Sequence, residues 1–278
     1  MDKVRELKNA YDTRAKYAQV KRDGYRLRIT RNPQGVVKVW TRRPKDWTAM
    51  VRNLPTAQTL WTRLNEPCIL HAEVWREDTD ATSVITHVKS ACPQVKLSVF
   101  GVERALPPEA TLTEVAMWCV KHGLDFIPYF IRGTRDAGCL GTFTSLADLP
   151  RPYGDVEGYV FKDYNGSEFG PQWQKWTIVK KITLRVSGLE PGKTGKNIGR
   201  VGSLICEDVS GVEVCAASGF SEAIRKRLTN ADVGRAIEVA FKGVGSNGRL
   251  RMPRFLRFRD DIDPSNVDSI KDLIGHGN

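Results

Sequence analysis

Short runs that alternate hydrophobic and polar residues dominate the first two thirds of the chain. A period of two is typical of strands with one buried face. It predicts strands at Tyr25–Thr30, Val36–Thr41, Cys68–Trp75, Lys96–Val102 and Glu157–Lys162. Hydrophobic residues spaced three or four apart predict helices at Trp47–Arg52, Thr56–Leu64, Ala81–Ser90, Thr113–His122 and Ser145–Leu149, and an amphipathic helix over residues 1–18. This mixture indicates an α+β domain of largely antiparallel sheets with flanking helices.

The pattern changes after Lys181. The rest of the chain predicts one short helix at Ser221–Thr229 and strands at Ile182–Ser187, Val201–Glu207, Val212–Ala216 and Ala236–Gly243. Several strands with glycine-containing turns and a single helix are typical of a small Greek-key barrel such as an OB-fold. No glycine- or proline-rich linker marks the junction. We therefore expect two domains, residues 1–181 and 182–278, joined by a short hinge.

The composition narrows the class of protein. Hydrophobic residues make up 41% of the 278 residues, which is enough for a buried core and excludes wholesale disorder. No apolar run reaches the ~18–20 residues of a membrane helix, and the polar start does not resemble a signal peptide. The six cysteines are scattered singly and there are four histidines, so a disulfide framework or a zinc site is not expected. We expect a monomeric protein of the cytoplasm that does not bind membranes.

The charge of the chain points to a polyanionic partner. Lysine and arginine number 43 against 32 acidic residues, a formal net charge of +11. Most of the excess lies before Ile182, and no basic tail or low-complexity segment accounts for it. An excess within folded sequence favours a binding surface, with nucleic acid as the first candidate.

The strongest local signal is Lys21-x-Asp23-Gly24-x-Arg26. A lysine with a pKa near 10.4 is normally protonated, and it becomes a nucleophile only in a desolvated or cation-rich site. Gly24 permits close backbone approach, and Arg26 offers a fork of donors to phosphate or carboxylate. Taken alone, the pattern is about as typical of a solvated strand edge before a tight turn as it is of a nucleophilic lysine.

Further candidates lie along the chain. Glu73 and Glu157 each interrupt an apolar strand, which suggests ligands for a metal or another cation, or structural salt bridges. Phe100, also in a strand, could stack on a base or pack in the core. Lys175 lies in a cationic segment beside the domain junction. Five arginines with no acid among them follow near the C-terminus: Arg249, Arg251, Arg254, Arg257 and Arg259.

In order and spacing these elements resemble the covalent nucleotidyltransferase superfamily, specifically ATP-dependent DNA ligases of the minimal phage or virus type. The resemblance covers nearly the whole chain. It implies an adenylation domain followed by an OB-fold, and it identifies Lys21 as the lysine that is adenylated, with Asp23 and Lys175 as further catalytic residues. It also implies ATP contacts from Gln19, Lys21, Arg26, Glu73, Phe100, Glu157, Lys175 and Lys180.

The resemblance implies two further partners. One is Mg²⁺, or Mn²⁺, held by Glu73 and Glu157. The other is nicked double-stranded DNA, whose 5′-phosphate Arg42 would contact, with the five C-terminal arginines on the duplex. The reaction it implies is adenylation of Lys21, transfer of AMP to the 5′-phosphate and attack by the 3′-hydroxyl. ATP is favoured over NAD⁺ because too few residues precede Lys21 for a domain that recognises nicotinamide. If the chain is phage-encoded, its compartment would be the host cytoplasm.

The sequence departs from the ligase pattern at four places. His71-Ala72 stands where Asp-Gly usually precedes the glutamate, and Gly101 replaces an acidic residue after the aromatic. Thr177 occupies the second lysine position of Lys-x-Lys, for which Lys180 or Lys181 is a substitute. Ile262 stands where a lysine is common, so Arg257 or Arg259 would take its part in lysine adenylation.

Three alternatives stay open from sequence. An mRNA-capping guanylyltransferase shares the lysine motif, both glutamates and the OB domain, but uses GTP. An RNA ligase shares the first domain but usually lacks an OB-fold with this arginine-rich end. A non-catalytic OB-type nucleic-acid binder is disfavoured because Lys21, Glu73 and Glu157 are all retained.

Overall fold

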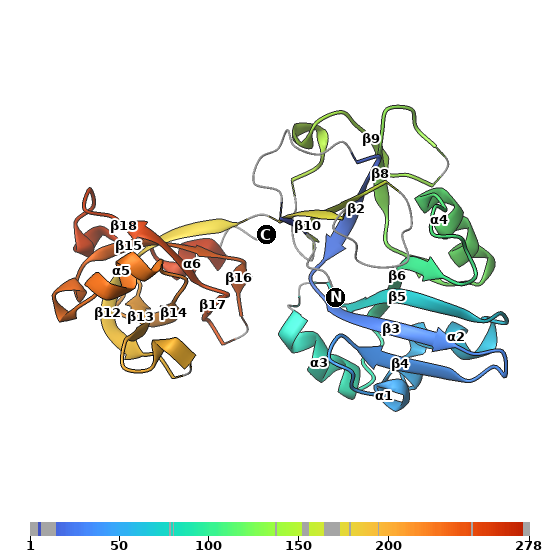
Figure 1. Ribbon diagram of the computed structural model, residues 1–278, viewed down its shortest axis with the longest axis horizontal. Coiled ribbons are helices and arrows are strands. Elements are labelled where there is room, and N and C mark those ends of the chain that lie inside the picture. Colours follow the sequence, from blue (N-terminus) through green and yellow to red (C-terminus); the bar gives the residue numbers. More distant parts are fainter. Residues whose placement is uncertain are drawn as a thin grey trace. The chain divides into compact units, whose positions relative to one another are not determined.

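A computed structural model describes residues 5–6, 15–77, 79, 81–136, 138–151, 156–163, 173–177, 179–193, 195–245 and 247–274. The chain divides into two compact units, Met1–Thr177 and Ile178–Asn278, and strand β12 (Lys180–Pro191) opens the second one (Figure 1). The sequence pattern placed this division slightly later, at 181/182. None of the helices in the described ranges is long and apolar enough to span a membrane.

Two sheets form the described part of the first unit. A six-stranded sheet has the order β1 (Arg5–Glu6), β11 (Gln174–Thr177), β10 (Val156–Lys162), β2 (Tyr17–Arg22), β8 (Tyr129–Arg132) and β9 (Gly141–Phe143). A five-stranded sheet has the order β4 (Val37–Thr41), β3 (Tyr25–Arg31), β5 (Cys68–Trp75), β6 (Lys96–Glu103) and β7 (Asp125–Phe126). Most neighbouring strands are antiparallel, and β2 turns directly into β3, so one tight turn connects the two sheets.

Helices and short 3₁₀ turns complete this unit. They are α1 (Thr48–Arg52), α2 (Thr59–Thr62), α3 (Ala81–Lys89) and α4 (Leu112–Lys121), with turns at Pro55–Ala57 and Leu146–Asp148. A capping box fixes the start of α4: Thr111 Oγ1 accepts from the Glu114 amide, and the Glu114 carboxylate accepts from the Thr111 amide. The largest core cluster combines the inner face of the five-stranded sheet with residues of all four helices, such as Leu27, Val51 and Val115. The candidate functional side chains of this sheet, such as Arg26 and Glu73, therefore lie on its opposite face.

The second unit is a small barrel. Its main sheet in the described ranges has the order β14 (Glu213–Ala217), β13 (Val201–Glu207), β12, β15 (Ala236–Phe241) and β18 (Arg254–Phe258). A parallel bridge between Ser218 and Arg254, with the Phe255 amide donating to the Ser218 carbonyl at 2.8 Å, joins the two outer strands and closes the sheet. The hairpin β16 (Gly243–Val244) and β17 (Leu250–Arg251), helices α5 (Glu222–Arg227) and α6 (Ile270–Ile274), and 3₁₀ turns at Gly195–Asn197, Asn230–Asp232 and Pro264–Asn266 surround it.

The prediction of an amphipathic helix over residues 1–18 is wrong for those of its residues that the structure describes. Arg5–Glu6 form a strand, Tyr17 and Ala18 begin β2, and residues 7–14 lie outside the described residues. Strand β2 lies inside its sheet between β10 and β8, so residues 17–20 are buried on both faces. A strand covered on both sides lacks the alternation that marks a half-exposed strand. The helix expected at Ser145–Leu149 is a single 3₁₀ turn.

Candidate active site

The turn between β2 and β3 brings Lys21 beside the five-stranded sheet. Gly24 in this turn lies so close to β5 that a Cβ atom there would be 2.4 Å from the Val74 carbonyl oxygen and 2.7 Å from the Glu73 Cγ. Only glycine fits this approach. The close backbone contact predicted for Gly24 is therefore confirmed, and its consequence is that the lysine motif and Glu73 are neighbours.

Glu157 reaches Lys21 because of a bulge in β10. The register of β10 against β2 shifts between Val156 and Gly158, and Gly158 lies opposite Lys21. The Lys21 Nζ donates to Glu157 Oε2 in an ion pair, with the side chains 27% and 12% exposed. Gly158 has φ +153°, and a Cβ atom there would be 2.0 Å from the Trp176 carbonyl oxygen. Bulges of this kind re-aim a side chain, here the Glu157 carboxylate.

Glu73 is a carboxyl group balanced between its charged and neutral forms. It lies on β5 opposite Arg26 of β3. Burial raises the pKa of Glu73 to about 7, and the positive charges of Lys21 and Arg26 oppose this rise, while Glu157 and Asp23 add to it. The Glu73 carboxyl group would therefore ionise readily near neutral pH when a positively charged ligand binds beside it.

Arg26 lies inside the same cluster. Its burial is the main cause that lowers the pKa of the guanidinium to about 10, and the nearby Arg42 contributes to the decrease. The Arg26 Cζ lies 5.7 Å from the centre of the Phe100 ring. Arg42 itself is exposed in the turn after β4. The structure thus brings together Lys21, Asp23, Arg26, Glu73 and Glu157, with Phe100 and Arg42 beside Arg26.

Phe100 and Gln19 are more deeply buried than a binding role suggests. Phe100 is 9% exposed and belongs to a core cluster between strands, so the interpretation of Phe100 as a core residue is confirmed. Gln19 is 2% exposed, and its Nε2 donates to the Ile127 carbonyl at 3.0 Å. Its Oε1 accepts from Lys162 Nζ at 2.5 Å. Both ends of the Gln19 amide therefore already bond within the protein.

Lys162 is a buried neighbour of the candidate site residues that sequence reasoning did not include among them. It is 1% exposed, and its Nζ also donates to the Phe100 carbonyl at 2.9 Å and lies 3.9 Å from the Trp173 ring centre. Burial is the main cause that lowers the pKa of Lys162 well below its usual value. The signal was available, since a lysine in the apolar strand Glu157–Lys162 must find partners inside. Lys162 links Gln19 to the strand that carries Phe100.

Lys175 and Thr177 share the face of the six-stranded sheet that carries Lys21. Val160 pairs with both Gln19 and Lys175, and Gly158 pairs with both Lys21 and Thr177, so these side chains leave the sheet on one side. Thr177 is 7% exposed, and its Oγ1 has no hydrogen-bond partner among the described residues. Lys180 begins β12 in the second unit and is not part of this face.

The described residues offer only a small donor set for a divalent metal. Within the ranges that the structure describes, no three His, Cys, Asp or Glu side chains are close enough to form a metal site. Two carboxylates, Glu73 and Glu157, do lie close enough to influence each other. Mg²⁺ is commonly bound by one or two carboxylates together with substrate phosphates, and this donor set fits that pattern.

Comparisons with known proteins agree with this architecture. Residues 191–259 match the family model described as DNA ligase OB-like domain. The solved structure named "Pmar-Lig_Pre." is similar at a TM-score of 0.67 and 19% identity, covering 93% of this chain and 67% of that chain. "DNA binding with a minimal scaffold: Structure-function analysis of Lig E DNA ligases" is similar at a TM-score of 0.62 and 20% identity, covering 93% and 100%. The chain has the two-domain fold of a DNA ligase.

A third solved structure, "Pmar-Lig_PreS3", gives a TM-score of 0.66 at 20% identity and covers 88% of this chain. The chain spans only 63% of that structure's length. No curated protein matches the chain. The predicted α+β fold with a C-terminal OB-type domain is confirmed by the strands and by the family match.

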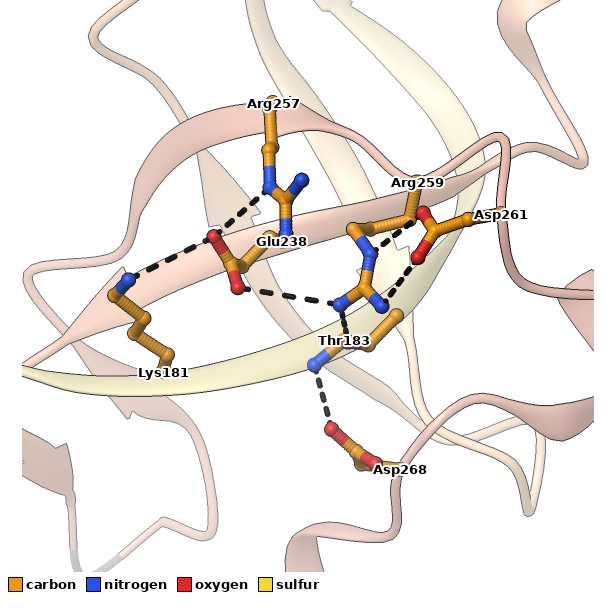
Figure 2. A network of polar contacts seen from close by, with 7 residues as sticks. All are labelled: Lys181, Thr183, Glu238, Arg257, Arg259, Asp261 and Asp268. Carbon is orange, nitrogen blue, oxygen red and sulfur yellow. Dashed lines mark hydrogen bonds and ion pairs between the residues drawn. The ribbon is translucent and has the colours of Figure 1, made fainter.

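The arginines of the ligase-type OB domain are less free than their sequence suggests. Arg249 pairs with Glu213 at 2.5 Å, and Arg259 forms two 2.8 Å hydrogen bonds with Asp261. The Glu238 carboxylate lies 3.3 Å from Arg257 and 3.9 Å from both Arg259 and Lys181. Figure 2 shows these contacts. The acids come from other strands and from the segment after β18, so the acid-free run is partly neutralised once folded. Arg254 is exposed and Arg251 is half-buried.

Proposed function

We propose that this chain is an ATP-dependent DNA ligase that seals nicks in duplex DNA through a lysyl-AMP intermediate. The observation that carries the proposal is the Lys21–Glu157 ion pair beside Glu73, in a chain whose second domain matches the DNA ligase OB-like family. ATP as the nucleotide is supported by the resemblance of Lys21-x-Asp23-Gly24-x-Arg26 to the ligase motif.

The proposed chemistry begins at Lys21. Its neutral Nζ attacks the α-phosphorus of ATP, a P–N bond forms, and the bond to the bridging oxygen breaks so that pyrophosphate leaves. An oxygen of the 5′-phosphate at a nick then attacks the AMP phosphorus, a P–O bond forms, the P–N bond breaks and Lys21 leaves as a protonated amine. The 3′-hydroxyl attacks that phosphate, the phosphodiester forms and AMP leaves. Lys21 must give up a proton and its contact with Glu157 before the first step, because an ammonium group has no lone pair.

The surrounding side chains are suited to phosphates. Lys175, on the same sheet face as Lys21, and the half-buried Arg26 both supply positive charge. Mg²⁺ or Mn²⁺, held by Glu73 and Glu157 together with the triphosphate, would neutralise further phosphate charge. We assign Asp23, Gln19 and Phe100 to the nucleotide site as well. Lys162 holds two of them in place, because its Nζ donates to Gln19 Oε1 and to the Phe100 carbonyl.

The proposed DNA partner is supported by charge. Arg42 is exposed beside Arg26, where a 5′-phosphate could be met close to Lys21. In the OB domain, Arg254 and Arg257 are the exposed arginines of β18, and Arg249, Arg251 and Arg259 lie on either side of them in the sequence. Phosphate contacts supply much of the affinity for a duplex. We assign Arg249, Arg251, Arg254, Arg257 and Arg259 to this role.

A labelling experiment tests the proposal. The full chain is incubated with Mg²⁺ and α-labelled ATP or GTP, and the label that stays on denatured protein is measured. We expect label from ATP and none in Lys21→Ala, with Lys226→Ala, an exposed lysine of α5, as the matched control. Label from GTP alone would support a capping enzyme instead, and no covalent label at all would refute both. Transfer of AMP to a nicked duplex but not to a single-stranded RNA end would then identify the substrate.

A further inference from the structure

Three polar side chains form a line across the five-stranded sheet. Arg26 Nη2 on β3 lies 3.3 Å from His71 Nδ1 on β5. His71 Nε2 lies 2.5 Å from Glu103 Oε1 on β6. The His71 and Glu103 side chains are 6% and 14% exposed. His71 is also the residue at which this chain departs from the Asp-Gly-Glu pattern of ligases, so the line is a feature of this sequence.

The direction of both hydrogen bonds follows from their chemistry. A guanidinium has donors and no acceptor, so His71 Nδ1 accepts the hydrogen bond from Arg26. The ring hydrogen then lies on Nε2, which donates to the Glu103 carboxylate. Glu103 thereby fixes the tautomer of His71, as carboxylates do for histidines that serve as ligands.

The line ends on a guanidinium that faces the candidate nucleotide site. Arg26 lies opposite Glu73 in the β3–β5 ladder and 5.7 Å from the Phe100 ring centre. An arginine on its flexible stem loses considerable side-chain entropy when it is fixed. A side chain that is already fixed by His71 loses less of this entropy when a ligand binds.

We propose that His71 and Glu103 are positioning residues that hold Arg26 ready for the nucleotide. The proposal rests on the proposed function, because it concerns nucleotide binding beside Lys21. Neither residue contacts the reacting atoms, and both act through Arg26. The line supplies the polar partner at the position where the ligase pattern has an aspartate, now as an acceptor nitrogen backed by a carboxylate.

Single-turnover adenylation of the full chain with α-labelled ATP tests this role. His71→Ala should raise the half-saturating ATP concentration about tenfold, the size expected for losing a hydrogen bond to a charged group. The saturated rate should stay within about threefold, because the reacting groups are intact. His71→Asn should recover most of the affinity, because its Oδ1 can accept from Arg26. In a double-mutant cycle, Glu103→Ala should add little once His71 is alanine.

A second histidine–glutamate pair in the same domain provides the control. His122 Nε2 lies 2.7 Å from Glu66 Oε1, and the His122 side chain is 3% exposed. His122→Ala should lower thermal stability and leave the half-saturating ATP concentration unchanged. If His71→Ala behaves like His122→Ala, or if His71→Ala and Glu103→Ala are additive, the proposal is overturned. If His71→Ala does not fold, the Glu103→Ala variant decides: an unchanged half-saturating ATP concentration overturns the proposal. Absence of label from the wild type would instead refute the proposed function.

Discussion

Gly158 lies opposite Lys21 in the ladder between β10 and β2, and the bulge beside it turns the Glu157 carboxylate onto the Lys21 ammonium. The ion pair holds the candidate nucleophile in place but in a form that cannot attack. Adenylation therefore requires that Glu157 exchange Lys21 for another cation or accept its proton. Glu157 therefore has two roles to consider. It restrains Lys21, and it is a candidate ligand for the metal that would accompany the triphosphate.

Replacing Glu157 separates these two roles. Glu157→Gln should reduce the saturated rate of lysine labelling on the order of 100-fold, because the site loses a charge that organises the phosphates and the metal. The measurement is single-turnover labelling with ATP and Mg²⁺. Glu190→Gln, which breaks the exposed pair with Lys193 in the other domain, is the matched control. A Glu157→Gln enzyme that is labelled faster than wild type would show that the carboxylate only restrains Lys21.

Glu73 should make the folding stability of the first domain depend on pH. Its pKa is raised from 4.5 to about 7, so the unfolded chain releases this proton at lower pH than the folded protein does. Folding stability is therefore lost as the pH rises from 4.5 through 7, by on the order of 3 kcal/mol in total, and it changes no further above that range. In Glu73→Gln this contribution is absent, so the variant should gain stability relative to wild type across that window.

Tryptophan fluorescence isolates the relevant transition. All seven tryptophans lie before residue 178, so urea unfolding followed by their emission reports on the first domain. The difference in unfolding free energy between Glu73→Gln and wild type should grow from pH 5 to 8. For comparison, Lys193 lowers the pKa of Glu190, so the stability from that group is lost as pH falls. A Glu73 difference that is constant with pH would contradict the raised pKa.

Short-range features of the site could be predicted from the sequence, because they depend on neighbours in the chain. The turn at Gly24 and the proximity of Lys21, Asp23 and Arg26 follow from six consecutive residues. The two glutamates were singled out because a carboxylate in an apolar strand needs a cation, and both do lie beside Lys21. Their mutual proximity came only from the resemblance, since it depends on the pairing of β10 with β2 and of β3 with β5.

Features that depend on strand pairing could not be predicted. Strand β2 is buried on both faces, so its residues lack alternation and were joined to a helix. The acid-free arginine run looked fully available because Glu213 and Glu238, which neutralise part of it, lie on other strands. The line from Arg26 to Glu103 likewise connects three strands, and His71 appeared in the sequence only as a departure from a pattern.

The Thr177 hydroxyl should lower the folding stability of the first domain and contribute to ATP binding. Its buried hydroxyl has no hydrogen-bond partner among the described residues, and it shares a sheet face with Lys21. Thr177→Val keeps the shape and removes the unsatisfied group, so we expect stability that is unchanged or up to about 1 kcal/mol higher. If the hydroxyl contacts the triphosphate, the half-saturating ATP concentration should rise several-fold. Fluorescence-detected unfolding and single-turnover labelling measure the two effects on the same samples. A variant that is stabilised and binds ATP as well as wild type would exclude Thr177 from the nucleotide site.

Glu238 should limit how tightly the OB domain holds DNA. Its carboxylate lies within 3.9 Å of cationic groups on Lys181, Arg257 and Arg259 (Figure 2). Glu238→Gln keeps the shape but releases these cations toward phosphates, so affinity for a nicked duplex should rise several-fold at low salt. The slope of log affinity against log salt should become steeper by about one, because one more phosphate contact releases counterions.

Fluorescence anisotropy with a labelled nicked duplex measures both quantities for Glu238. Glu222→Gln, which releases the exposed Arg200 from its 3.1 Å pair, removes the same charge from the same domain. If net charge alone governed binding, the two variants would behave alike. We expect the larger gain and the steeper slope in Glu238→Gln, because its cations adjoin the arginines assigned to DNA. Equal effects of the two variants would mean that Arg257 and Arg259 serve the fold of the barrel and that DNA is held elsewhere.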